Sequence, residues 1–182
     1  YGDTIQFARY LPMVAQRGGV VIAECQSAAL IPLMENIPGV SEVCVMGEEL
    51  PPFDLESPLL SLPHIFGTEL DTVPDRVPYL APPPERLAHW REKLSGDPGF
   101  KVGLVWAGKP LPDPFRSCPI AELTPLSEVP GVTLYSLQVG EEGAKAHECP
   151  GLVDLTAGIR DFGDTAALIA GLDLVISVDT SV

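Results

Sequence analysis

The sequence predicts an α/β protein built from two Rossmann-like halves. Short apolar strands alternate with amphipathic helical patterns along the chain, and this alternation stops at a proline-rich stretch near residues 80–100 and then begins again. The last stretch, 163–182, has the pattern of a helix, a continuous apolar strand and a small polar turn. Parallel sheets covered by helices produce such sequences, so we expect two halves that face a cleft.

Composition limits the classes of function. The chain has 182 residues, of which 46% are hydrophobic, and this is ample for a packed core. Its 25 acidic and 11 basic side chains give a net charge of −14, which opposes binding along a phosphate backbone. No apolar run approaches the roughly 20 residues that a membrane-spanning helix needs. We therefore expect a cytoplasmic protein that binds no nucleic acid and does not span a membrane.

Metal and cofactor sites are not supported by the sequence. The four cysteines are far apart, with no Cys-x-x-Cys pair and no histidine at ligand spacing, so we expect buried free thiols and no zinc: Cys25, Cys44, Cys118 and Cys149. No two aspartates have the Asp-x-Asp spacing that holds a divalent cation on a diphosphate. We expect no metal and no resident cofactor.

The first half, residues 1–82, is expected to be a Rossmann-like domain that lacks its first strand. A helix is predicted over 5–16, with a kink or an early end at Pro12 and a stop at the glycines 18 and 19. The other predicted elements are a strand at 20–24, a helix from 26 or 27 to 36, a strand at 42–46 and a third strand at 53–60. Residues 72–84 carry many prolines and are predicted to be a connecting segment.

The second half is predicted to start after a linker at 83–100 that contains a bridging helix, Pro84–Leu94. Proline at the start of this helix and basic residues near its end suit both helix termini. The domain at 101–182 is then predicted to contain strands at 101–106, 132–138, 152–154 and 172–178 and helices at 121–128 and from 165 onward. The strand at 172–178 is nearly continuous in Leu, Val and Ile, so we expect it to be buried on both faces.

Both ends of the chain interrupt a pattern. Tyr1 leads directly into a helix with no initiator Met and no preceding strand, and the last strand is followed only by Asp179-Thr180-Ser181 and Val182. We therefore expect a truncated piece of a longer protein. In open α/β sheets ligands bind beyond the carboxyl ends of the strands, where the N–H groups of a following helix attract phosphate, so Asp179, Thr180 and Ser181 are candidates for such a site. The alternative is an ordinary helix-capping run.

Five stretches, in order, resemble a known family: GDTIQFARYLP, FDLESPLLSLPHIFGT, KVGLVWAGKP, YSLQVG and DFGDTAALIAGLDLVISVDT. Together they are similar to the glycosyltransferase-like domain that follows tetratricopeptide repeats in many bacterial proteins. That domain resembles the ADP-heptose lipopolysaccharide heptosyltransferases, which have the two-domain GT-B fold. The resemblance implies a hexosyl- or heptosyltransferase type of enzyme that is inverting and metal-independent. It would move a sugar from a nucleotide-diphosphate donor to a hydroxyl of an unknown glycan or protein acceptor, with tetratricopeptide repeats as possible neighbours.

The resemblance also implies roles for single residues on the acceptor side. The family's Gly-Asp motif, whose Asp is the proposed general base, matches Gly2 and Asp3, and Thr4 follows it. The alternative for Asp3 is a helix cap, because Asp164 in the second Gly-Asp-Thr sequence, 163–165, is also expected to cap a helix.

On the donor side the resemblance points to the phosphate groups. The family's Asp-Thr-Gly stretch binds donor phosphates through backbone N–H groups and matches Asp179-Thr180-Ser181, with Ser in place of Gly. A basic residue in the loop after the first strand of the second half helps to hold the diphosphate in relatives. In this chain Lys109 and Arg116 are the candidates.

Two further strand ends are candidates for donor contacts. Trp106, with Gly108 just after it, follows one predicted strand and either stacks on the nucleotide base or packs in the core, the commoner place for such a residue. Gln138 ends another strand and either contacts base or ribose or is a solvated amide at a loop edge.

Two classes of function remain open at this point. One is the glycosyltransferase, and the other is a catalytically inactive GT-B-like binding or interaction module attached to tetratricopeptide repeats. Basic residues placed at the diphosphate would favour catalysis, and their loss would favour a binding role.

Overall fold

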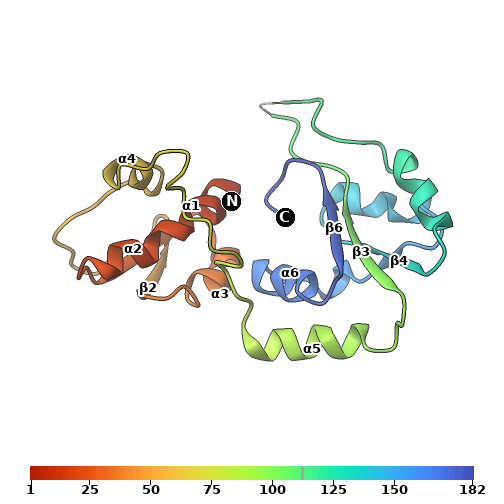
Figure 1. The fold of residues 1–182 in the computed structure, drawn as a ribbon, viewed down its shortest axis with the longest axis horizontal. Coiled ribbons are helices and arrows are strands. Elements are labelled where there is room, and N and C mark those ends of the chain that lie inside the picture. Colours follow the sequence, from red (N-terminus) through yellow and green to blue (C-terminus); the bar gives the residue numbers. More distant parts are fainter. Residues whose placement is uncertain (112) are drawn as a thin grey trace. The chain divides into compact units, whose positions relative to one another are not determined.

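The computed structural model describes residues 1–111 and 113–182, and it has an α/β architecture with two separate parallel sheets (Figure 1). The contacts divide the chain into two compact units. The first unit contains Tyr1–Pro83 and Asp161–Gly163, and the second contains Pro84–Arg160 and Asp164–Val182. The helix expected in the linker therefore belongs to the second unit. That each unit is a Rossmann-like domain of a GT-B protein stays a prediction.

The first unit is built from a two-stranded sheet and short helices. Its elements are α1 (Gly2–Phe7), η1 (Ala8–Tyr10), α2 (Leu11–Gln16), β1 (Val21–Cys25), η2 (Ala28–Leu30), α3 (Ile31–Met34), β2 (Val40–Val45), η3 (Leu59–Ser61) and α4 (Leu62–Ile65). Strands β1 and β2 pair in parallel, with a shift of register between Val21 and Ile22. Proline lies in the first turn of α2, α3 and α4, where its missing N–H costs no helical hydrogen bond. Pro12 thereby divides the helix predicted over 5–16.

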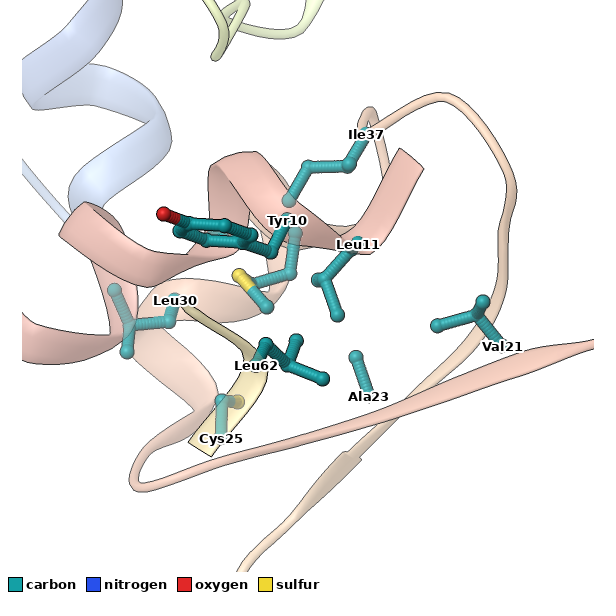
Figure 2. Packing of buried hydrophobic residues seen from close by; sticks show 10 residues of the cluster. Tyr10, Leu11, Val21, Ala23, Cys25, Leu30, Ile37 and Leu62 are labelled. Atoms are coloured by element: carbon teal, nitrogen blue, oxygen red, sulfur yellow. The ribbon is translucent and has the colours of Figure 1, made fainter. Parts of the chain in front are cut away.

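Side chains from these helices and from β1 form the core of the first unit (Figure 2). Ala8 and Leu30 are fully buried, and Leu62 reaches the same cluster from α4. The rings of Tyr10 and Phe66 stack with their centroids 6.1 Å apart. Because the helices have only three to six residues each, this packing, and not helix propensity, holds them in place.

The third strand predicted at 53–60 is wrong. Among the described residues this stretch forms only the start of η3, and Phe53 and Leu55 are exposed, Leu55 to 91%. Pro58 offers no N–H to a ladder, so the stretch cannot pair along its length. The connecting segment that follows is attached to η1 through Arg9, whose Nη1 donates to Pro74 O at 3.0 Å and whose guanidinium lies 4.3 Å from the centre of the Tyr79 ring.

The second unit contains a four-stranded parallel sheet in the order β5-β4-β3-β6. Its elements are α5 (Pro84–Leu94), β3 (Phe100–Val105), η4 (Ile120–Glu128), β4 (Val132–Ser136), η5 (Glu141–Glu148), β5 (Val153–Asp154), η6 (Thr156–Gly158), α6 (Phe162–Ile169) and β6 (Leu174–Ser177). The helix predicted at 121–128 is present as the 3₁₀ helix η4, with Pro125 inside it.

Two apolar clusters cover this sheet. One contains Leu104 and Trp106 with Ile120 from η4 and Ala146 from η5. The other contains Val105 of β3, together with two buried side chains from α5 and two from α6: Trp90, Leu94, Ala167 and Leu168. Because neighbouring residues of β3 contribute to different clusters, β3 is buried on both faces, as its apolar run predicts.

Strand β6 does not have the burial that the sequence predicts. It pairs only with β3 and is the last strand of the sheet order, and Leu174 and Ile176 are 47% and 36% exposed. The expectation that this strand is buried on both faces is therefore wrong for the described chain. Apolar composition predicts the strand, but its burial depends on which elements lie beside it.

A buried carboxylate connects α6 to α5. Asp164 is 1% exposed, and its Oδ1 accepts hydrogen bonds from Trp90 Nε1 at 3.2 Å and from Arg160 Nη2 at 3.1 Å. Its Oδ2 accepts from Arg160 Nε at 2.8 Å and from Arg160 N at 3.1 Å, and Arg86 Nη1 lies 3.4 Å away. The N–H of Gly163 donates instead to Asp161 Oδ1, at 2.9 Å. The expectation that Asp164 acts as a simple cap is therefore wrong, because its oxygens are occupied by groups outside α6.

These contacts set the ionisation of Asp164. Burial by itself would raise the pKa of this carboxyl, but the hydrogen bonds from Arg160 and Trp90 and the charge of Arg86 outweigh burial and lower the pKa to about 2. The folded state therefore stabilises the carboxylate relative to the unfolded chain. A shift from the ordinary value of 3.8 to about 2 corresponds to roughly 2 kcal/mol.

We expect Asp164→Asn to lower the free energy of unfolding by about 2 kcal/mol at pH 7, because the amide removes the charge that the arginines stabilise. This contribution is complete above the ordinary pKa of an aspartate and is lost as the pH falls towards 2, so the two proteins should converge in stability at low pH. Urea titrations at several pH values measure it. Asp3→Asn is the matched control, because Asp3 is the exposed aspartate of the first Gly-Asp-Thr sequence, and it should change stability by less than about 0.5 kcal/mol. Equal losses in the two variants would contradict the assignment.

Candidate functional site

The donor-side residues predicted from the sequence gather at one edge of the second sheet. Trp106 to Arg116 follow β3, Gln138 follows β4, and Asp179 to Ser181 follow β6. Because all four strands are parallel, their carboxyl ends lie at the same edge. Hydrogen bonds between the loops then bring several of these residues into contact.

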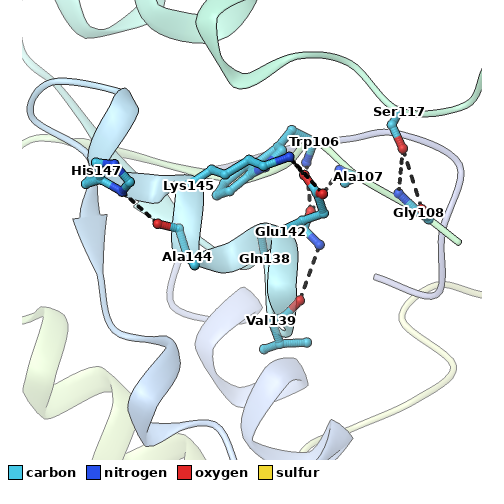
Figure 3. A network of polar contacts seen from close by, with 10 residues as sticks. All are labelled: Trp106, Ala107, Gly108, Ser117, Gln138, Val139, Glu142, Ala144, Lys145 and His147. Carbon is cyan, nitrogen blue, oxygen red and sulfur yellow. Dashed lines mark hydrogen bonds and ion pairs between the residues drawn. The ribbon is translucent and has the colours of Figure 1, made fainter.

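The side chain of Gln138, which follows β4, bonds to the backbone that follows β3 (Figure 3). Its Oε1 accepts hydrogen bonds from Trp106 N at 3.1 Å and from Ala107 N at 2.8 Å, and its Nε2 donates to Val139 O at 3.4 Å. The residue is 8% exposed. Its side-chain amide therefore links the loops that follow β3 and β4. The alternative of a solvated amide at a loop edge, which the sequence left open, does not fit this burial.

Trp106 lies in the core at this edge. The residue is 1% exposed and packs in the cluster that η4 and η5 cover, which is the core alternative considered from the sequence. Its Nε1 has no hydrogen-bond partner among the described residues. Since the ring is covered, Trp106 contributes its backbone to the edge, and stacking of this ring on a donor base stays a prediction.

Gly108 allows two loops to approach closely. A Cβ atom at this position would lie 2.7 Å from Arg116 Cδ and 3.3 Å from Asp179 O, and the first distance is below any real Cβ contact. The N–H of Gly108 donates to Ser117 Oγ at 3.2 Å, which fixes the two ends of the loop after β3 (Figure 3). A residue with a Cβ at this position would force the Arg116 side chain to move.

The guanidinium of Arg116 has N–H donors that make no hydrogen bond to the described residues. Its side chain is 21% exposed, and its Nη1 lies 3.4 Å from Asp179 O and 3.9 Å from Asp179 Oδ2. Both contacts are long for a charged donor. The Nε atom is buried and has no partner among the described residues. A guanidinium presents five N–H groups in one plane, so this arrangement can bind an anion with two or more of them.

The remaining donor-side residues are less tightly placed. Lys109 is exposed on the loop after β3, and Thr180 and Ser181 are half-buried beyond β6. The helix N-terminus expected after Ser181 stays a prediction.

The acceptor-side residues lie in the first unit, at the start of α1. Tyr1 is the N-cap, so Asp3 lies inside the first turn as an exposed residue, and the alternative that it caps a helix beginning near Thr4 does not fit. Thr4 is 3% exposed, and its Oγ1 donates to Gln26 Oε1 at 2.6 Å, just beyond β1. This bond attaches α1 to the carboxyl end of β1 and leaves the Asp3 carboxylate in solvent.

The two Gly-Asp-Thr sequences thus have different structures. Asp164 is enclosed by arginines and Trp90, whereas Asp3 is exposed. A carboxylate that is already saturated with donors and has its pKa lowered is a poor proton acceptor. Of these two aspartates, Asp3 is the one available for chemistry.

The sequence does not predict the bond between Ser117 and Gly108 or the structural role of Gln138. The hydroxyl of Ser117 is exposed and bonds Gly108 across the loop, and no local pattern predicts this pairing. The bond from Gln138 to β3 depends on the register of β3 against β4, where Leu104 lies opposite Ser136. A polar residue two places beyond a strand end is the only signal that the sequence offers.

The structure also bears on metals, thiols and membranes. Cys25, Cys44 and Cys149 are buried free thiols and Cys118 is half-buried, and burial raises the pKa of Cys25 and of Cys149. Within 1–111 and 113–182 no three His, Cys, Asp or Glu side chains come together as a metal site would need. Over the same residues, every helix is too short or too polar to cross a bilayer.

Comparison with known proteins finds one partial relative. Protein FlbA of Caulobacter vibrioides is 38% identical over 128 residues, in an alignment that covers 63% of this chain and 21% of FlbA. The chain thus spans about a fifth of the length of the curated relative it matches. No family model matches the chain, and no solved structure does. The chain is therefore a distant, partial homologue of FlbA.

We expect Asp179→Asn to strengthen the binding of inorganic pyrophosphate by about two- to fivefold, because the exposed Asp179 carboxylate offsets part of the charge of Arg116. Isothermal titration calorimetry at low salt measures the affinity, and the gain should shrink as salt is added. Glu92→Gln on α5 removes the same charge elsewhere and is the control. Weaker binding by Asp179→Asn would show instead that the carboxylate helps to organise the site.

Proposed function

We propose that this chain is the glycosyltransferase part of its protein and transfers a sugar from a nucleotide-diphosphate donor to an acceptor hydroxyl. The observation that carries the proposal is Arg116, a half-buried guanidinium with unused donors at the carboxyl edge of a parallel sheet. Ligands of open α/β sheets bind at this edge. Arginine there suits an oxyanion such as a phosphate, because the planar guanidinium can donate two parallel N–H bonds to a pair of its oxygens. The family resemblance of the sequence supports the same assignment.

The leaving group explains the need for a cation. As the bond between the anomeric carbon and the phosphate oxygen breaks, both electrons stay with that oxygen and charge develops on the diphosphate. Arg116 would neutralise this charge, with Lys109 as a second cation on the same loop. In a chain with a net charge of −14, local cations of this kind would offset the repulsion between the protein and an anionic ligand.

Asp3 would supply the base. The acceptor oxygen attacks the anomeric carbon from the face opposite the leaving diphosphate and loses its proton to the carboxylate, so configuration inverts as the new glycosidic bond forms. An exposed carboxylate on a short helix suits this role, since it can meet a substrate hydroxyl. Thr4 and Gly2 would then shape the backbone around it, with Thr4 anchored to Gln26.

A non-catalytic binding module is the second candidate. The observation in its favour is the ion pair between Arg116 and Asp179, which reduces the charge available to a leaving group. Such a module would bind a nucleotide or a partner without turning over.

We expect Asp3→Asn in the intact protein to reduce sugar transfer by at least about a hundredfold, because the amide keeps the size of the side chain but cannot accept a proton. Affinity for the nucleoside diphosphate should remain nearly unchanged, which serves as the internal control. Turnover is measured with a donor and acceptor that the wild type uses. A loss smaller than about tenfold would assign the base to another residue.

We also expect nucleoside diphosphate binding and sugar transfer to survive EDTA. Backbone N–H groups beyond β6, Arg116 and Lys109 would balance the diphosphate charge in place of a metal. Calorimetry and activity assays with and without chelator measure both. Binding that disappears with EDTA and returns with Mn²⁺ would identify a carboxylate-held cation instead.

A further inference from the structure

The loop after β3 exposes two large apolar side chains. Leu111 is 80% exposed and Phe115 is 90% exposed, the highest values for large hydrophobic residues in the described part of the second unit. Single exposed apolar residues are ordinary on protein surfaces. These two, however, lie on the loop that carries Lys109 and Arg116 and that follows the carboxyl end of β3, the kind of sheet edge where open α/β folds bind ligands.

The backbone holds Phe115 beside the anion-binding group. The N–H of Phe115 donates to Asp113 Oδ1 at 2.8 Å, a local turn that fixes the residue relative to the loop. The next residue is Arg116, whose chain passes Gly108 so closely that a Cβ there would lie 2.7 Å from Cδ. Phe115 is therefore an exposed aromatic residue that directly precedes Arg116 in the loop.

This placement suits one part of a nucleotide. In a nucleoside diphosphate the base is separated from the phosphates by a single ribose, so a ring next to the phosphate-binding residue is within reach of the base. Aromatic side chains gain from stacking on bases, and this gain does not depend strongly on which base is present. The covered ring of Trp106 is not available for this in the structure, since that residue is 1% exposed.

We propose that Phe115 stacks on the base of the bound nucleoside diphosphate and thereby makes the site select nucleotides over bare diphosphate. This inference rests on the proposed function, because it requires the diphosphate to be held at Arg116. Leu111 adds exposed apolar surface on the same loop. The ring remains exposed without ligand and loses that exposure when the nucleotide binds.

Calorimetry on the intact protein tests this with two probes, inorganic pyrophosphate and a series of nucleoside diphosphates (ADP, GDP, UDP and CDP). We expect Phe115→Ala to weaken binding of the preferred nucleoside diphosphate by at least about fivefold and to leave pyrophosphate affinity unchanged. Phe115→Tyr keeps a stacking ring and should restore nucleotide affinity to within about twofold of wild type. Phe100→Ala is the matched control, because Phe100 is a half-exposed phenylalanine at the opposite end of β3.

The outcomes separate the two proposals. Equal nucleotide affinity in Phe115→Ala and wild type would overturn the stacking role while leaving the diphosphate site intact. An equal loss for pyrophosphate and nucleotide would also overturn it, since the substitution would then act through Arg116. A wild-type protein that binds neither probe would overturn the proposed function and, with it, this inference.

Discussion

The buried carboxylate of Asp164 is the contact on which the second unit depends. Removing a carboxylate from water is costly, and here the cost is offset by Trp90, by the side chain and backbone of Arg160, and by Arg86. Because two of these partners lie on α5, the carboxylate holds α5 to the start of α6. Helix α6 leads into β6, and β6 leads to Asp179, the residue that meets Arg116. The strand that leads to Asp179 therefore follows directly in sequence on the helix that the Asp164 ion pairs hold against α5.

Two residues beyond the strand ends, Gln138 and Gly108, shape the candidate site. Gln138 takes up the N–H groups that β3 leaves free, and Gly108 leaves space for a guanidinium. Arg116 is then only partly satisfied, since its contacts with Asp179 are 3.4 and 3.9 Å long. Arg116 therefore keeps hydrogen-bonding capacity that no described residue uses.

Much of the second unit could be predicted from the sequence. Helix α5 begins and ends as predicted, and β3 and β4 follow from apolar runs bounded by turn residues. The rule that ligands bind at the carboxyl ends of parallel strands predicted the residues at this edge, and their donor role stays a prediction. The exposure of β6 could not be predicted, because apolar residues do not reveal which side of a strand has a neighbour. Nor could the two Gly-Asp-Thr sequences be told apart, since the burial of Asp164 comes from α5, far away in the sequence.

The short helices of the first unit have a consequence for Asp3. A six-residue helix such as α1 is far below the length at which an isolated helix is stable in water. Its helical conformation therefore depends on tertiary contacts with neighbouring elements. The buried hydroxyl of Thr4 against Gln26 and the packing of Ala8 and Leu30 supply that support. The backbone that carries Asp3 is consequently only as rigid as the small core beneath it. Sequence changes in that core would therefore alter the position and mobility of Asp3 without replacing its carboxylate.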